Sequence, residues 1–226
     1  KATQLCDGYV VSNTLDAGYL EKRHKLNKSK IACISQAPSG AFRALPVKEM
    51  TETRMHRLLY VAGFHYAKGP HAVATAVNKL LKDNQALSFT WVCHVDDHDK
   101  VRGLLEPECL ERTRLLGWMR QEDLVKEFDE HGIFIYPTLF DGFGKVFLEA
   151  MSRGLCVIGT RAGGMVDIIR HGENGYLCDF NNAEQIVGAV GCMNESFDLA
   201  NQISICAAST ARNYTWERVG REMSEF

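Results

Sequence analysis

The sequence predicts an α/β protein built around a doubly wound, mostly parallel sheet with a helical tail. Short runs rich in Val, Ile and Phe alternate along the chain with segments of helical period. The runs are apolar at successive positions, as expected for strands that are covered by helices on both faces. Alternation of this kind is typical of parallel sheets with helical crossovers.

Six runs between residues 57 and 179 are the predicted strands of this sheet. They lie at 57–64, 87–93, 113–118, 132–137, 155–160 and 174–179. A helix is expected over 70–82, where apolar residues recur at helical spacing, and a second is expected to close at Gly132. The tail beyond residue 182 is predicted to be helical.

Residues 1–50 resemble the end of a neighbouring domain more than a domain in its own right. Two further strand candidates, CDGYVVSN (6–13) and KIACISQAP (30–38), flank a basic helical segment around 14–27. The stretch 39–57 then has the pattern of a linker. We therefore divide the chain into a domain edge with linker at 1–50, a main domain at 51–212 and a C-terminal helix at 213–226.

Composition and charge exclude several functional classes. The chain is 46% hydrophobic and 24% charged, with a net charge of −2, which argues against a basic nucleic-acid-binding protein. No apolar run approaches the roughly 20 residues of a membrane helix, and no signal peptide opens the chain. The scattered cysteines form no CxxC pair, so reduced thiols and a cytoplasmic location are expected.

Ligands of open parallel sheets bind beyond the carboxyl ends of the strands, where the strand order reverses. The segments that directly follow predicted strands are therefore the candidate binding loops. They are GFHYAKG (63–69), CHVDDHD (93–99), GWMRQED (117–123), TLFDGFGK (138–145) and TRAGGMVD (160–167).

The segment FDGFGKVFLEA (140–150) predicts an anion site, most plausibly for phosphate. Gly142 and Gly144 let the backbone turn sharply and expose main-chain N–H groups just before a predicted helix. Lys145 in the first helical turn is unfavourable by about 0.3–1 kcal/mol unless an anion offsets it. Lys68 in the first loop is a candidate second phosphate contact.

Two acidic residues flank this anion site. Glu149 lies one helical turn further on, at a position where a carboxylate can accept hydrogen bonds from sugar hydroxyls. Asp141 lies just before the turn, near whatever group is attached beyond the phosphates. Spacing alone leaves other interpretations open: Asp141 as a helix cap, and Lys145 with Glu149 as a surface pair.

The combined motifs resemble those of retaining glycosyltransferases of the GT-B fold, glycosyltransferase family 4. The segment FIYPTLFDGFGKVFLEAMSRGLCVIGTRAGGMVDIIRHGENGYL (134–177) is similar to that family's signature region. LLYVAGFHYAKG (58–69) resembles its first strand and Lys-Gly loop, and YTWERV (214–219) its tail. CDGYVVSN and ISQAPSGAF (34–42) resemble the end of its N-terminal domain and the interdomain linker. The likeness covers nearly the whole chain.

This resemblance implies a Rossmann-like domain that binds a nucleotide diphosphate sugar as donor. Asp141 and Glu149 stand where the family has two acids. Glu149 would bind the ribose, and Asp141 would hold the transferred hexosyl group together with the amides of Gly142, Phe143 and Gly144. Asp141, Glu149 and Lys68 are accordingly the candidate catalytic residues.

Lys68 would neutralise the diphosphate leaving group, and the base would rest against the Trp118–Met119 backbone. The resemblance implies no protein nucleophile, no cofactor and no metal ion. The remaining positions that it assigns to donor binding are Gly63, Lys145, Val146, Gly163 and Gly164.

The chain departs from the family pattern at several of these positions. Asp141 is one methylene shorter than the usual Glu, and Asp167 replaces a second usual Glu. Phe64 and His65 occupy the region where an arginine often assists the lysine. Lys145 replaces an apolar residue or asparagine and would partly restore the missing charge.

Several alternatives remain. Acceptor recognition in this fold belongs mainly to an N-terminal domain, so either the chain is a fragment or a partner chain completes it, and the acceptor is unknown. A non-catalytic nucleotide-sugar-binding or scaffold module, and a related GT-B phosphorylase or epimerase, are the rival functions. The acidic loop 93–99 has the residue types of a metal site but is interpreted as a polar loop. The basic run 21–30 is interpreted as a solvated helix end, so membrane contact is unsupported.

Overall fold

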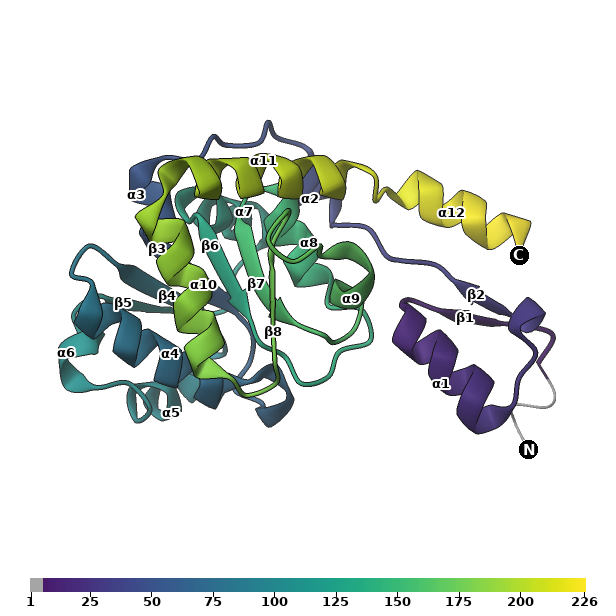
Figure 1. Cartoon of the computed structure of the whole chain (residues 1–226), viewed down its shortest axis with the longest axis horizontal. Coiled ribbons are helices and arrows are strands. Elements are labelled where there is room, and N and C mark those ends of the chain that lie inside the picture. Colours follow the sequence, from purple (N-terminus) through teal and green to yellow (C-terminus); the bar gives the residue numbers. More distant parts are fainter. Residues whose placement is uncertain (1–5) are drawn as a thin grey trace.

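A computed structural model describes residues 6–226, and its centre is a parallel sheet of six strands in the order β5-β4-β3-β6-β7-β8 (Figure 1). The strands are β3 (Arg57–Val61), β4 (Ser88–Val92), β5 (Thr113–Leu116), β6 (Ile133–Tyr136), β7 (Cys156–Thr160) and β8 (Tyr176–Cys178). Every pairing between them is parallel. The predicted doubly wound α/β fold is therefore confirmed, with strands that are shorter than the apolar runs.

The strand order reverses between β3 and β6. From β3 the chain moves outward through β4 to β5, and then returns to the other side of β3 and moves outward again through β6, β7 and β8. Leu58 pairs with Ile133 and Leu59 with Phe134 across this junction. The loops that follow β3 and β6 lead to helices on opposite faces of the sheet, and the crevice that forms at such a point is the expected ligand site.

Helices cover both faces of the sheet. On one face α4 (Pro70–Asp83) packs beside α10 (Ala183–Glu195). On the other, α2 (Gly40–Arg43) packs against α7 (Gln121–Glu130) and α8 (Lys145–Ser152), while α11 (Phe197–Arg212) lies against α8 and β7 (Figure 1). The remaining short elements of this body are η3 (Tyr66–Lys68), η4 (Val95–Asp97), α3 (Glu52–Met55), α5 (His98–Arg102), α6 (Pro107–Leu110) and α9 (Met165–Ile168).

The pattern of apolar residues explains this packing. In α4 the residues Val73, Ala76, Val77 and Leu80 recur at helical spacing and are all buried. All residues of β6 and β7 are buried, because helices lie on both sides of these central strands.

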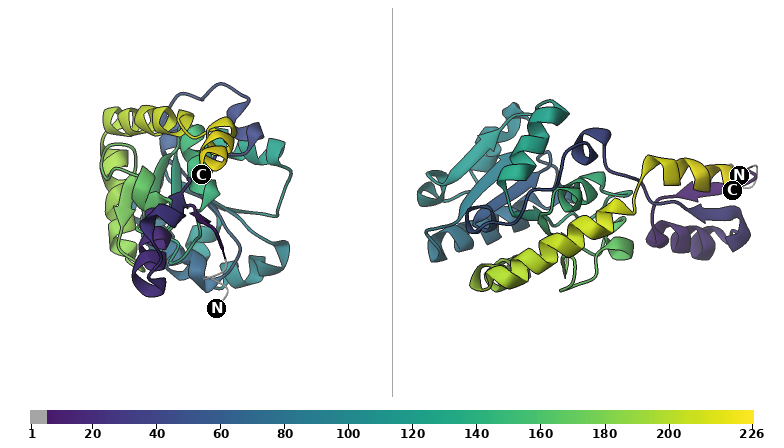
Figure 2. Two further views of the ribbon diagram at one scale, coloured as in Figure 1. Left: turned by 90° about the vertical axis from the view of Figure 1, so that its right-hand side faces the viewer. Right: turned by 90° about the horizontal axis from the view of Figure 1, so that it is seen from above.

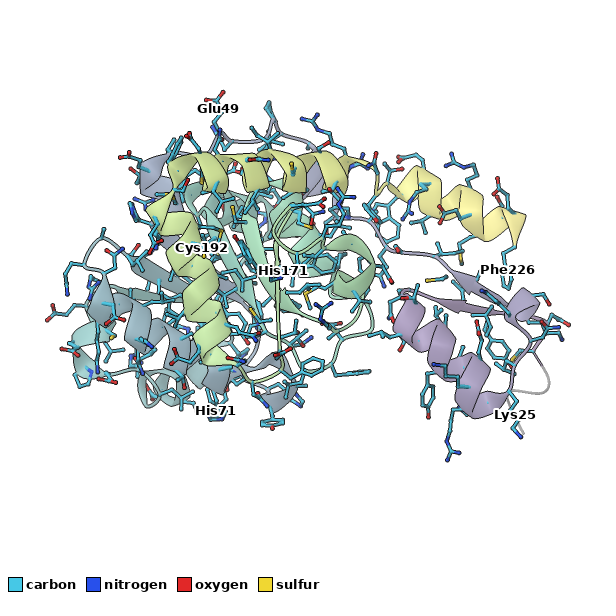
Figure 3. All side chains as sticks on the ribbon, in the orientation of Figure 1. Lys25, Glu49, His71, His171, Cys192 and Phe226 are labelled. Atoms are coloured by element: carbon cyan, nitrogen blue, oxygen red, sulfur yellow. The ribbon has the colours of Figure 1, made fainter. Side chains whose placement is uncertain are left out.

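An N-terminal unit projects from one end of the α/β body, together with the last helix (Figures 1 and 2). It comprises β1 (Tyr9–Val11), α1 (Thr14–His24), η2 (Lys28–Lys30) and β2 (Ile31–Cys33), with β1 and β2 paired in parallel. Helix α12 (Trp216–Glu225) extends over this unit. Phe226, labelled in Figure 3, packs so closely on Gly8 that a side-chain carbon there would lie 2.6 Å from its ring.

Residues 39–57 join the N-terminal unit to the body and are more ordered than their linker pattern indicates. Two one-turn helices, α2 and α3, form there. Arg153 is fully buried and donates hydrogen bonds to the carbonyls of Leu45 and Pro46, both at 2.7 Å. Arg54 does the same for Lys48 and Glu49. These tertiary contacts fix the segment, and a local sequence pattern carries no sign of them.

Within residues 6–226, no helix combines the length and apolar character that crossing a membrane requires.

Candidate functional site

Lys68 and Asp141 meet in the crevice between β3 and β6. Lys68 follows β3 and Asp141 follows β6, and the lysine Nζ lies 2.5 Å from the Asp141 Oδ2. The Tyr136 hydroxyl donates to the same oxygen at 2.5 Å and lies 3.2 Å from the lysine nitrogen. Two segments that are 73 residues apart in sequence thus place a cation and a carboxylate at the strand-order reversal.

The surroundings of Asp141 hold it in the charged form. Burial raises the pKa of its carboxyl, but hydrogen bonds from Lys68 and Tyr136, the lysine's charge and the Phe143 amide outweigh it, so the pKa lies below its ordinary value. Burial and the same carboxylate raise the pKa of Tyr136. The side chains of Lys68 and Asp141 remain 31% and 19% exposed, so a ligand can still reach the pair.

The loop that carries Lys68 is held against the loop of Asp141. The Tyr60 hydroxyl donates to the carbonyl of Lys68 at 2.7 Å, and the amide of Leu139 donates to Ala67 at 2.7 Å. Gly69 has φ +74°, and a side-chain carbon there would lie 2.4 Å from the carbonyl oxygen of Pro137. Only glycine combines this backbone conformation with so close an approach.

The turn before α8 has no side-chain cap, although the Phe143 amide already donates to the Asp141 carboxylate. Gly144 caps the helix with φ +83°, and no side chain bonds to the cap, so the interpretation of Asp141 as a helix cap is wrong. A side chain at Gly142 would meet no atom within 4 Å, which shows that this point of the loop borders open space. The beginning of α8 therefore presents its N–H groups and positive dipole end beside Lys68 and Asp141.

Glu149 lies inside α8 and is buried, with 6% of its surface exposed. Its Oε1 accepts hydrogen bonds from the Ser39 hydroxyl at 2.5 Å and the Ser39 amide at 3.3 Å. The Nζ of Lys145 is 3.9 Å from the same oxygen. Because Glu149 is buried and bonded to another segment, the interpretation of Lys145 and Glu149 as a simple surface pair is wrong.

Other predicted donor-binding residues lie around the same edge of the sheet. Trp118 follows β5 and is 53% exposed, whereas Met119 is partly buried against the core. Val146 is also partly buried there, and a side chain at Gly63 would meet no atom within 4 Å. This edge of the sheet therefore has an exposed aromatic ring at Trp118 and a backbone that borders open space at Gly63.

Gly163 and Gly164 pack against the loop that carries Asp141 and Phe143. A side-chain carbon at Gly163 would lie 2.9 Å from the Asp141 carbonyl, and one at Gly164 would lie 2.4 Å from the Phe143 ring. The Gly164 amide donates to the Phe143 carbonyl at 2.9 Å. These glycines allow the loop after β7 to pack tightly against the loop after β6.

The N-terminal unit also contacts the site. Asn13, which caps α1, donates to the Gly142 carbonyl at 2.5 Å. Asp167 accepts from the Thr14 amide at 2.8 Å and from the Thr14 hydroxyl. Asp167 of α9, which stands where the resemblance places a glutamate, therefore joins the segment after β7 to the beginning of α1.

Tyr136, Ser39 and Asn13 are site residues that sequence reasoning missed. Tyr136 lies at the end of an apolar strand, and only its hydroxyl, at the carboxyl end of that strand, distinguishes it from a core residue. Ser39 and Asn13 reach the site from segments more than 100 residues away in sequence. No local signal predicts such contacts.

A cavity of about 470 Å³ adjoins Asp141 on the side facing α1. Leu15 and Tyr19 of α1 line one wall, and Phe140 and Phe180 line the other. All four side chains are at least 50% exposed. The cavity is distinct from the surroundings of Glu149, since neither Glu149 nor Ser39 lines it.

The acidic loop after β4 pairs its carboxylates with nearby cations. Asp97 bonds to Lys100 at 2.7 Å, Asp99 bonds to Arg102 at 2.8 Å, and Asp96 lies 3.3 Å from His94. Across residues 6–226, no group of three or more His, Cys, Asp or Glu side chains is placed to hold a metal ion.

Phe64 and His65 fill the region where the family often has an arginine. Phe64 stacks on Trp91 with ring centroids 6.3 Å apart, and Lys100 lies over its ring. The ring of His65 accepts from the Ala67 amide at 3.2 Å and caps the turn that carries Lys68. Both side chains shape the loop, and neither adds a fixed charge like that of arginine.

Comparison with known proteins gives a family match. Residues 55–195, more than half of the chain, match the family model described as "Glycosyl transferases group 1". A D-inositol 3-phosphate glycosyltransferase of Corynebacterium urealyticum is 23% identical over 243 residues, covering 97% of this chain and 56% of that protein. A sucrose synthase of Acidithiobacillus caldus is 38% identical over 100 residues, or 42% of this chain and 13% of that protein. The chain thus spans little more than half the length of the first relative, and less of the second.

Solved structures share the fold. The Anabaena protein Alr3699/HepE, in complex with UDP and glucose, superposes with a TM-score of 0.82 at 14% identity, covering 99% of this chain and 64% of that one. The C-terminal domain of a glycosyl transferase group 1 family protein (LpcC) from Francisella tularensis gives a TM-score of 0.66 at 17% identity. There the overlap covers 74% of this chain and 94% of the solved domain.

Proposed function

Because the chain belongs to the glycosyltransferase group 1 family and has its GT-B architecture, we propose that it is the donor-binding part of a retaining glycosyltransferase. Its donor is a nucleotide diphosphate sugar, from which a hexosyl group passes to an acceptor. The observation that carries this proposal is the Lys68–Asp141 pair in the crevice between β3 and β6. Beside the pair lies the amide-presenting turn of residues 142–144.

In this proposal Lys68 exchanges its partner when the donor binds. The diphosphate takes the place of Asp141 as the counter-charge of Lys68, and the 142–144 amides hold its oxygens. The bond between the anomeric carbon and the phosphate oxygen then breaks, and its electron pair stays on the diphosphate. A lysine and amides fixed at this place stabilise that developing charge.

Tyr136 keeps its hydrogen bond to Asp141 after Lys68 has moved. The carboxylate then stays fixed beside the transferred sugar and accepts hydrogen bonds from its hydroxyls. The acceptor hydroxyl forms the new bond to the anomeric carbon and gives its proton to the departing phosphate. No side chain needs to act as nucleophile in this sequence.

The positions of the other residues indicate where the ribose, the base and the acceptor would bind. The ribose lies on Glu149 and the base against residues 118–119, where Trp118 is exposed. The acceptor approaches Asp141 through the cavity between α1 and the 139–141 loop. Complexes of Alr3699/HepE with UDP and with UDP-glucose support a nucleotide-sugar donor.

Calorimetric titration of the chain with UDP-, GDP- and ADP-sugars tests this function. We expect one nucleotide class to bind, and Glu149→Ala to weaken that binding at least about tenfold, because a hydrogen bond to a charged group contributes roughly 1.5–3 kcal/mol. Glu173→Ala is the matched control, since Glu173 pairs with Arg170 on the surface away from the site. Failure of all three sugars to bind, or equal binding by Glu149→Ala, would contradict the proposal.

A second candidate is donor binding without transfer. The absence of an arginine beside Lys68 favours it, because Phe64 and His65 occupy that region among the described residues. Donor turnover by the chain together with the N-terminal domain of a relative would exclude this candidate. Tight binding of the donor with no release of nucleoside diphosphate would support it.

A further inference from the structure

Ser39 makes the closest contact with the carboxylate of Glu149. The Ser39 hydroxyl donates to Oε1 at 2.5 Å, and the Ser39 amide points to the same oxygen at 3.3 Å. Both residues are buried, Ser39 with 8% and Glu149 with 6% of its surface exposed. Ser39 lies in the segment that joins the N-terminal unit to the body, outside the predicted donor domain.

All the polar groups around Glu149 gather on one of its two oxygens. Lys145 also approaches Oε1, at 3.9 Å. Among the described residues, none donates a hydrogen bond to the side chain's second oxygen, Oε2. A carboxylate can accept about four hydrogen bonds, so Oε2 keeps its capacity for a ligand.

We propose that Ser39 is a positioning residue of the ribose site, which holds Oε1 so that Oε2 meets the vicinal hydroxyls of a nucleoside diphosphate. The inference rests on the proposed function and extends the donor site to a second segment of the chain. The terminal torsion of a glutamate has broad, shallow preferences. Two donors on a single oxygen fix the plane of the carboxylate, and the ligand then meets a pre-oriented acceptor.

Gln121 sets the direction of the Ser39 hydroxyl. Its Nε2 donates to the Ser39 oxygen at 3.4 Å. A serine hydroxyl has one proton, so an oxygen that accepts from Gln121 directs that proton to Glu149. Gln121 opens α7, three residues after Trp118, so this chain of hydrogen bonds runs from the beginning of α7 through Ser39 to Glu149.

The backbone of Ser39 is itself held by the C-terminal helix. The Trp216 indole donates to the Pro38 carbonyl at 3.0 Å, and Arg218 donates to the Ser35 carbonyl at 2.6 Å. On the other side, Phe42 is buried against Phe128 with ring centroids 5.0 Å apart. Ser39 is thus fixed from both sides, as a positioning role requires.

The test compares two ligands on the variant Ser39→Ala. The probes are the nucleoside diphosphate that binds the wild-type chain (UDP, GDP or ADP) and its 2′,3′-dideoxy analogue, each titrated calorimetrically. We expect Ser39→Ala to weaken the ribonucleotide about 5–10-fold, the size of the net contribution of one ordinary hydrogen bond, because Ser39 acts on the ligand only through Glu149. The dideoxy analogue should lose less than about twofold, because it offers Glu149 no hydroxyl.

Ser152→Ala is the matched control. Ser152 is a partly buried serine of α8, the helix that also contains Glu149. Its hydroxyl bonds to the backbone carbonyl of Glu149 at 2.7 Å and does not bond to the carboxylate. This variant should not weaken the ribonucleotide more than the dideoxy analogue. A thermal unfolding curve of each variant shows whether the fold is retained.

The outcomes separate this inference from the proposed function. If the wild-type chain binds no nucleoside diphosphate, both are overturned. If it binds with a preference for ribose and Ser39→Ala weakens both ligands equally, or neither, the positioning role is wrong while the donor site stands. If Ser39→Ala weakens the binding of the ribonucleotide and leaves that of the dideoxy analogue unchanged, both the donor site and the positioning role of Ser39 are supported.

Discussion

At the scale of single residues, the site depends on how a half-buried carboxylate is kept charged. Burial disfavours the charged form of Asp141, but Lys68 and Tyr136 both bond to its Oδ2 at distances of 2.5 Å. Lysine is the partner that a diphosphate can take over, whereas the tyrosine hydroxyl stays. In the proposed donor complex, Tyr136 and the Phe143 amide would therefore keep Asp141 charged.

Tyr136→Phe removes one hydrogen bond that lowers the pKa of Asp141. Burial still raises that pKa, so the variant should titrate at higher pH than the wild-type chain. A lowered folded-state pKa stabilises the protein above the unfolded pKa, and this contribution is lost as pH falls. The loss should begin at a higher pH in Tyr136→Phe. Carbon-13 NMR of the aspartate carboxyl groups measures the pKa, and urea unfolding measures the stability.

Tyr60→Phe is the control for this measurement. Tyr60 is equally deep in the core, but its hydroxyl bonds to the Lys68 carbonyl instead of the carboxylate. It should lower the stability and raise the pKa of Asp141 by less than Tyr136→Phe does, because it acts on the carboxylate only through the position of Lys68. An unchanged titration of Asp141 in Tyr136→Phe would show that the tyrosine has no part in holding its charge.

At the scale of elements, the two loops after β3 and β6 act as one unit. Ala67 accepts hydrogen bonds from Leu139 and Thr138, and Gly69 passes directly against Pro137. The position of Lys68 relative to Asp141 therefore depends on the fit between the loops. We expect changes at this contact to alter both stability and donor binding.

Gly69→Ala tests that fit. Alanine at φ +74°, with its side-chain carbon 2.4 Å from a carbonyl oxygen, should cost about 2 kcal/mol or more in the free energy of unfolding. Gly188→Ala in α10 is the control, because a side chain there meets no atom within 4 Å. It should leave stability unchanged or raise it by up to about 1 kcal/mol. Equal urea midpoints for the two variants would show that the contact between the loops does not require glycine at position 69.

Most strands and helices of the α/β body could be predicted from the sequence. Apolar runs and helical periods located the six strands and the main helices, because burial on both faces leaves a local pattern. The placement of Lys68 near the 142–144 turn also followed, since parallel strands bring their following loops to one edge, but its ion pair with Asp141 was not predicted. The two helices within 39–57 did not follow, because Arg153 donates to this segment from a distant part of the chain and Arg54 of α3 bonds to the distant carbonyl of His131. Ser39 and Asn13 were missed for the same reason.

At the scale of the whole molecule, the site is completed from outside the α/β body. The N-terminal unit contributes Asn13 and Thr14, and α12 fixes the segment that carries Ser39. Figures 1 and 2 show this unit and α12 projecting together from the end of the body next to α8 and α9. If the proposed donor site is correct, these outer parts set its geometry while the sheet supplies its charges.

The proposed function and the role of Ser39 both require a nucleotide sugar to bind across Lys68, the 142–144 amides and Glu149. A crystal structure of the chain with the nucleoside diphosphate that it binds shows directly whether this happens. We predict the diphosphate on Lys68 and these amides, Tyr136 still bonded to Asp141, and the ribose hydroxyls on the free oxygen of Glu149. A nucleotide bound elsewhere, with the Lys68–Asp141 pair intact, would contradict the proposed donor site.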